Sequence, residues 1–91
     1  MIIVSYDISN DKLRRQFSKF ISKFGYRLQY SVFEIKNSEH ILDNIRIEIK
    51  NNFEERFSDE DSILIFQLSK TCKIERYGYA KHDGDDVLIV K

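Results

Sequence analysis

Apolar residues along the first part of the chain follow two different periods. Residues 2–7 open with Ile2, Ile3 and Val4 and form a short apolar run that is typical of a buried strand. After Ser9 the spacing becomes helical, and the apolar positions are Leu13, Phe17, Phe20, Ile21 and Phe24, with Gly25 as a C-terminal stop. Ser9 or Asn10 can cap this helix by accepting a hydrogen bond from an N–H group of its first turn. The pattern predicts a strand followed directly by an amphipathic helix.

Residues 26–35, YRLQYSVFEI, are strand-like but change parity in the middle. Leu28, Tyr30 and Val32 share one face of an extended chain, whereas Phe33 and Ile35 occupy the other parity. A slip of one residue predicts either a β-bulge or a very tight turn. One bent strand and a short hairpin both remain open.

The second part of the chain repeats the alternation of helix and strand. Asn37 or Ser38 is expected to cap a second helix, whose inner face carries Ile41, Leu42, Ile45, Ile49 and Phe53. The acidic residues 54–61 are expected to form a loop. Three further strands are expected: a fully apolar one at 62–69, a weaker alternating one at 72–79 and a short one at 87–90 after a turn. The order β-α-β(β)-α-β-β is typical of an α+β sandwich, a ferredoxin-like fold in a single domain, residues 1–91.

The last strand, within residues 86–91, contains four unbroken apolar residues. Such a strand at the edge of a sheet exposes unpaired backbone groups and apolar side chains, which pairing with another chain would satisfy. The alternative is a plain edge strand within the same domain.

The composition indicates a second apolar surface that a partner would cover, and a reducing cellular compartment. Five Tyr and seven Phe are many for 91 residues, so a homodimer that covers part of them is plausible. The single cysteine, Cys72, fits a reducing compartment. No signal peptide precedes the first strand, and no apolar run approaches the ~18 residues of a membrane span. We therefore expect a cytoplasmic protein that does not enter the membrane.

The net charge is zero, but basic and acidic residues are concentrated in different parts of the chain. The 15 basic and 15 acidic residues cancel, yet residues 12–33 hold six basic residues and no acid, and residues 34–61 hold nine acids against four bases. The basic side chains of the first helix include Lys12, Arg14, Arg15 and Lys19. Arginine forks bind phosphate through two hydrogen bonds, so Arg14 and Arg15 are candidates for phosphate contact. For Lys19 and Lys23 the simpler interpretation is a solvated helix face.

Asp7 is the most unusual polar residue, because it ends an apolar strand just before a basic helix. Within one chain it can support the helix cap or pair with Arg14 or Arg15. It can also be a hard oxygen ligand for Mg²⁺ or Mn²⁺, ions that one or two carboxylates often hold together with substrate phosphates. Two copies of Asp7 can meet across the twofold axis of a dimer. The sequence contains no nucleophile–base pair, P-loop or GxGxxG motif, so it supports neither covalent catalysis nor nucleotide binding.

Three stretches together resemble a known family: VSYDISNDKLRRQ, FGYRLQYSVFEI and DSILIFQLS. They resemble the small CRISPR-associated adaptation protein Cas-two, in which a strand ends in Tyr-Asp and a helix follows with clustered basic residues. The more specific part is the string Arg-x-Gln-x-Ser-Val-Phe-Glu, which here spans Arg27 to Glu34. The likeness covers roughly the first seventy residues. Some relatives carry another basic residue two positions after Arg14, where this chain has Gln16.

The resemblance implies a homodimer of ferredoxin-like subunits packed sheet to sheet, with a pair of Asp7 side chains as a site for Mg²⁺ or Mn²⁺. It implies a metal-dependent endonuclease on RNA or DNA, and a DNA-binding scaffold for the CRISPR integrase. The C-terminal strand would then pair with a partner protomer or with the integrase. Catalytic roles are implied for Tyr6, Asp7, Arg14, Arg27 and Phe33. Alternatives are a stand-alone ribonuclease toxin of the virulence-associated protein D type and a generic ferredoxin-like RNA-binding module.

Overall fold

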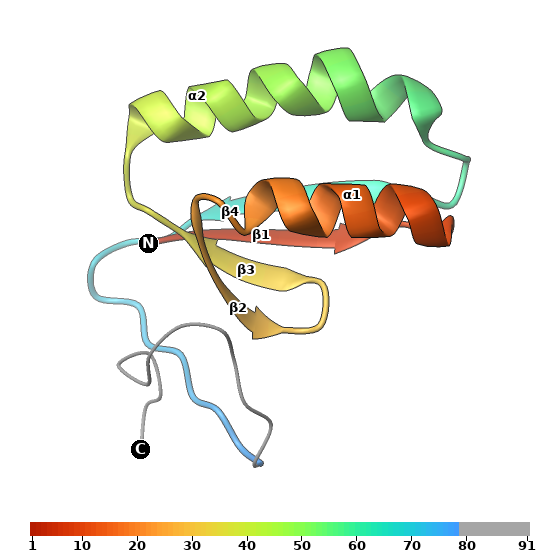
Figure 1. Ribbon diagram of the computed structural model, residues 1–91. Helices are drawn as coiled ribbons and strands as arrows, with labels where there is room; N and C mark the ends of the chain where they lie inside the picture. The colour runs from red at the N-terminus through yellow and green to blue at the C-terminus, as the bar shows by residue number, and fades with distance from the viewer. Residues whose placement is uncertain (79–91) are drawn as a thin grey trace.

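The computed structural model describes residues 1–78, which form one antiparallel sheet covered on one face by two helices (Figure 1). The elements are β1 (Ile2–Asp7), α1 (Asp11–Ile21), β2 (Gly25–Gln29), β3 (Val32–Ile35), α2 (Glu39–Glu48) and β4 (Ser62–Gln67). The strands lie in the order β2-β3-β1-β4. This order confirms the predicted ferredoxin-like fold, because β1 pairs with β3 and β4, which are distant from it in sequence.

The central strand β1 separates the core from the open face of the sheet. Its residues Ile2, Val4 and Tyr6 are buried beneath the helices, as are Phe33 and Ile35 of β3. From the helices, the core receives Leu13, Phe17 and Ile21 of α1 and Leu42 and Ile45 of α2. Successive side chains of a strand point to opposite faces, so Ile3, Ser5 and Asp7 lie on the face without helices. The predicted apolar positions of both helices are thereby confirmed.

Both helices begin at a predicted cap. The Asn10 side-chain oxygen accepts a hydrogen bond from the Leu13 N–H at 2.8 Å, and the Ser38 hydroxyl accepts one from the Ile41 N–H at 3.3 Å. The helix α1 ends at Ile21, before the predicted stop, and Gly25 instead opens β2. A Cβ atom at Gly25 would lie 1.9 Å from the Glu34 carbonyl oxygen, so only glycine allows β2 to approach β3 this closely.

Residues 26–35 contain both a β-bulge and a tight turn, the two alternatives that the change of parity left open. They form a β2–β3 hairpin, and the pairing register shifts between Arg27 and Gln29, as it does in a β-bulge. At the tight turn Ser31 has a φ of 68°, in the left-handed region. The Ser31 carbonyl oxygen accepts a hydrogen bond from the Tyr6 N–H at 3.0 Å, which fixes the turn against β1.

Two predicted segments differ from the structure. The helix α2 continues through a π-helical turn, Ile49–Phe53, and a 3₁₀ turn, Glu54–Arg56, so the predicted acidic loop begins later. The strand predicted at 72–79 is wrong for its described residues, because residues 72–77 form no ladder. Alternate residues of that segment are half-buried, and Ile74 and Arg76 line a pocket together with Leu28 and Phe66 on the open face. Its period of two comes from this packing, without strand pairing.

The strand predicted at 87–90, and with it the docking of residues 86–91, lies outside the described residues. No helix within residues 1–78 is long and apolar enough to cross a membrane.

A carboxylate ties the loop before β4 to the connection between β1 and α1. Asp61 Oδ1 accepts hydrogen bonds from the Ser9 N–H at 2.9 Å and the Ser9 hydroxyl at 3.0 Å, and its Oδ2 accepts one from the Ser58 N–H at 2.9 Å. These bonds, with the Ser9 N–H contributing most, lower the pKa of Asp61 below its usual value. The link holds the chain between Asp7 and α1 in place.

We expect Asp61→Asn to lower the melting temperature at pH 7 by a few degrees, because an amide cannot accept all three hydrogen bonds with its oxygen. A group with a lowered folded-state pKa stabilises the fold above its unfolded pKa of about 3.9, and this contribution is lost as the pH falls through the folded value. The gap between variant and wild type should therefore close in acid. Thermal melts followed by circular dichroism from pH 7 to pH 2.5 measure it. Asp59→Asn, in the same loop, is the control, and a gap of constant size at every pH would contradict the role of the charge.

Candidate functional site

A pocket of about 350 Å³ lies between α1, the end of β1 and the β2–β3 hairpin. Its lining comes from four segments of the chain: Tyr6, Asp11, Arg14, Arg15, Ser18, Arg27 and Tyr30. The fold thus brings Arg14 and Arg15 of the helix together with Arg27 of the second strand. Of the predicted catalytic residues, Tyr6, Arg14 and Arg27 line this pocket.

Arg27 is held in place by a hydroxyl and an aromatic ring. Its Nη2 donates a hydrogen bond to the Ser18 Oγ of α1 at 2.8 Å. Phe33 is its paired residue on β3. The guanidinium carbon of Arg27 lies 5.1 Å from the centre of the Phe33 ring, a distance suited to a cation–π contact. Phe33 is fully buried and stacks with Tyr6 at 6.3 Å between ring centres. Phe33 therefore lies beneath the pocket and supports its guanidinium.

Arg14 is held by the chain that precedes its own helix. Its Nη1 donates to the Ile8 carbonyl oxygen at 3.1 Å, and its Nη2 donates to Asp11 Oδ1 at 2.5 Å. The hydrogen bond to Asp11 is the largest of the contributions that raise the pKa of Arg14 above its usual value, and the Tyr30 hydroxyl adds a smaller one. The guanidinium is therefore permanently charged and fixed in direction.

The remaining basic residues of the helix present their charges to solvent. Arg15 is exposed at the pocket, and Lys12 and Lys19 are exposed on α1 outside it. The side-chain oxygen of Gln16 accepts a hydrogen bond from Arg56. A guanidinium thus reaches this position from the 3₁₀ turn after α2.

Asp7 lies on the other side of the sheet from the pocket. Tyr6 is 6% exposed, and its ring packs edge-on against Phe17 of α1 at 4.9 Å. The next residue of the strand, Asp7, is exposed and must point to the open face. The central strand therefore separates the predicted carboxylate from the predicted arginines.

The interpretations of Asp7 as a structural residue find no support within the described chain. Asn10 caps α1, and Arg14 pairs with Asp11. Across residues 1–78, Asp7 has neither an ion pair nor a side-chain hydrogen bond, and no three His, Cys, Asp or Glu residues gather closely enough to hold a metal ion. Within residues 1–78, Asp7 is therefore an exposed carboxylate outside any cluster of three metal-ligating side chains.

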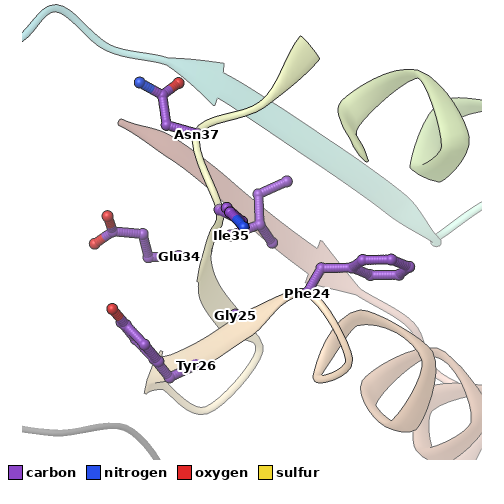
Figure 2. Close-up of a pocket in the computed structure, with 7 residues that line it drawn as sticks. Phe24, Gly25, Tyr26, Glu34, Ile35 and Asn37 are labelled. Atoms are coloured by element: carbon purple, nitrogen blue, oxygen red, sulfur yellow. The ribbon is translucent and has the colours of Figure 1, made fainter. Parts of the chain in front are cut away.

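The open face of the hairpin carries a second pocket, of about 440 Å³, that the sequence did not predict. Tyr26 and Glu34 project together to one side of the hairpin, while Phe24 and Ile35 project toward the core (Figure 2). The Glu34 Oε1 is buried and accepts no hydrogen bond from the described residues, and burial raises the pKa of this carboxyl. The only sequence signal was its place as the last residue of the Arg-x-Gln-x-Ser-Val-Phe-Glu string.

The sequence matches one protein family over most of its length. A family model described as "CRISPR associated protein Cas2" matches residues 1–76. The chain is 30% identical over 91 residues to the CRISPR-associated endoribonuclease Cas2 2 of Methanospirillum hungatei, with 97% of each chain covered. It is 31% identical over 87 residues to the CRISPR-associated endoribonuclease Cas2 of Thermococcus kodakarensis, covering 96% of this chain and 98% of that one.

Solved structures with a similar fold include a Cas2 protein. Streptococcus pyogenes Cas2 at pH 6.5 superposes with a TM-score of 0.63 at 27% identity, covering 77% of this chain and 87% of that one. The hypothetical protein TT1823 of Thermus thermophilus gives a TM-score of 0.69 at 28% identity, covering 86% and 89%.

Proposed function

The chain belongs to the Cas2 family of CRISPR-associated proteins, and from that premise we propose that it is a divalent-metal-dependent endoribonuclease that works as a homodimer. Relatives that cover nearly all of this chain are named endoribonucleases. The observation that carries the proposal is the position of Asp7, which ends the central strand on the open face without a partner among the described residues. A carboxylate placed in this way is free to bind a cation together with groups from a second copy of the chain.

The open face supplies a reason for a second copy to bind there. Two residues of β4, Leu64 and Phe66, are 55% and 43% exposed, and Leu68, which follows the strand, is 36% exposed. An apolar patch of this kind marks an interaction surface, and residues 74–76 lie beside only part of it. In a dimer with a twofold axis the same face is used by both chains, so sheet-to-sheet packing also brings the two copies of Asp7 to one interface.

The donors present fit Mg²⁺ or Mn²⁺. Asp7 offers hard carboxylate oxygens, and no cationic side chain of residues 1–78 forms an ion pair with it. Such ions are held by one or two carboxylates, with water and substrate phosphate oxygens in the remaining positions. A pair of Asp7 side chains meets this requirement. When bound there, the cation would supply an activated water and stabilise the leaving oxygen of the phosphodiester.

The other predicted residues bind and orient the nucleic acid. Arg14 and Arg27 present fixed guanidinium groups to phosphate, and Tyr6 and Phe33 support Arg27 from beneath. The exposed Lys12, Arg15 and Lys19 attract the backbone at longer range. The same cations suit the second role that we propose, a DNA-binding scaffold for the CRISPR integrase, and that role does not require Asp7.

We expect Asp7→Ala to abolish cleavage of single-stranded RNA in Mg²⁺ or Mn²⁺, with a loss of at least about 100-fold, because a metal ligand contributes several kcal/mol to the transition state. Asp7 is exposed, so the melting temperature and the mass of the dimer should not change. Gel assays of cleavage, with light scattering as the test of assembly, measure both. Asp7→Asn should fail in the same way, and cleavage by either variant at the wild-type rate would remove Asp7 from the mechanism.

For the scaffold role, the double variant Arg14→Glu, Arg15→Glu should weaken binding to duplex DNA and flatten its salt dependence. Each lost phosphate contact reduces the slope of log K against log salt by about 0.9, so we expect a reduction of about 2. Anisotropy titrations at several salt concentrations measure the slope. The control Lys50→Glu, Lys70→Glu changes the charge equally at two exposed sites away from the pocket. Equal slopes for the two double variants would show that the arginines act only through net charge.

A further inference from the structure

Tyr30 is an exposed aromatic residue in a fixed position at the pocket. It precedes Ser31 in the tight turn of the hairpin, and the hydrogen bond from the Tyr6 N–H holds that turn against β1. Its side chain lines the pocket, although the residue is 73% exposed. The ring therefore borders the pocket and is accessible to a ligand bound there.

The ring of Tyr30 is also unstacked. The neighbouring rings of Tyr6, Phe17 and Phe33 pack against one another, whereas no ring pair among residues 1–78 includes Tyr30. A free aromatic face beside cations is how many proteins bind single-stranded nucleic acid, since every base has a flat face that stacks on such a ring.

The charge of the pocket suits the phosphate of the same nucleotide. The pocket lining contains three arginines and one acid, Asp11, which pairs with Arg14. Arg14 and Arg27 are already oriented, the first by the Ile8 carbonyl and Asp11, the second by Ser18 and Phe33. Prior orientation lowers the entropy that binding would otherwise cost. A volume of about 350 Å³ is within the range of small-molecule pockets, which begins at about 300 Å³.

We propose that this pocket is a subsite for one unpaired nucleotide of single-stranded RNA, with the phosphate on Arg14, Arg15 and Arg27 and the base stacked on Tyr30. The inference rests on the proposed ribonuclease function and deepens it. Because Asp7 lies on the opposite face of the sheet, the subsite holds a nucleotide apart from the bond that is cut, and the RNA strand passes around the end of β1. A base inside a duplex is already stacked and paired, so this subsite selects unpaired RNA.

The test compares Tyr30→Ala, which removes the ring, with Tyr30→Phe, which keeps it. The probes are a fluorescein-labelled eight-nucleotide oligouridylate and an RNA duplex of equal length, titrated in EDTA so that no cleavage occurs. Loss of one stacked base should weaken binding of the single strand by Tyr30→Ala about 5- to 150-fold. Tyr30→Phe should bind the single strand as the wild type does, and duplex binding should be the same for all variants. Tyr77→Ala, at an exposed tyrosine outside the pocket, is the matched control.

Single-strand binding by Tyr30→Ala at the wild-type affinity, or an equal loss for single strand and duplex, would overturn the subsite. Cleavage is scored separately in Mg²⁺ and Mn²⁺. A wild type that cleaves RNA, with a Tyr30→Ala variant that binds it unchanged, overturns the subsite and leaves the proposed activity in place. Binding that depends on the Tyr30 ring, in a protein that cleaves with neither cation, supports the subsite and overturns the proposed activity.

Discussion

The alternation of side chains along β1 places two of the predicted functional residues, Tyr6 and Asp7, on opposite faces of the sheet. This strand is paired on both edges, with β3 and with β4, so its register cannot slip without breaking two ladders. The side chains of its last two residues therefore point in opposite directions. Tyr6 is directed into the core beneath the helices, and Asp7 is directed to the open face. A single peptide unit thus separates an arginine pocket from a lone carboxylate.

The pocket owes its geometry to the packing beneath it. Phe33 is buried at the centre of the core, where it contacts both the Tyr6 ring and the Arg27 guanidinium. Tyr6 and Phe33 are therefore part of the hydrophobic core and support the site at the same time. The open face has the opposite character, because it combines exposed apolar side chains with Asp7 and the buried oxygen of Glu34. The first surface suits phosphate, and the second suits another protein surface.

Local signals in the sequence were sufficient to predict most of the helices and strands and some of the residues of the site. Caps, helical spacing and apolar runs depend on neighbouring residues, so Asn10, Ser38 and the strands β1 and β4 were predictable. The division of residues 26–35 into β2 and β3 stayed open, because a bulge and a tight turn change the parity in the same way. The family string pointed to Arg27 and Phe33. The link from Asp61 to Ser9 spans 52 residues and has no local signal. The error at 72–79 has a related cause, since a period of two records alternate burial and does not require a partner strand.

The central claim is that two copies of Asp7 form one metal site, since no group of three potential metal ligands lies among residues 1–78. Mixed dimers test this most directly. Wild-type and Asp7→Ala chains carrying different affinity tags are combined, and the dimer that contains one of each is isolated and assayed for RNA cleavage. If the two carboxylates form one site, the mixed dimer should cleave no faster than the Asp7→Ala homodimer. A mixed dimer with half the wild-type rate would show that each chain carries a complete site, and it would contradict this account.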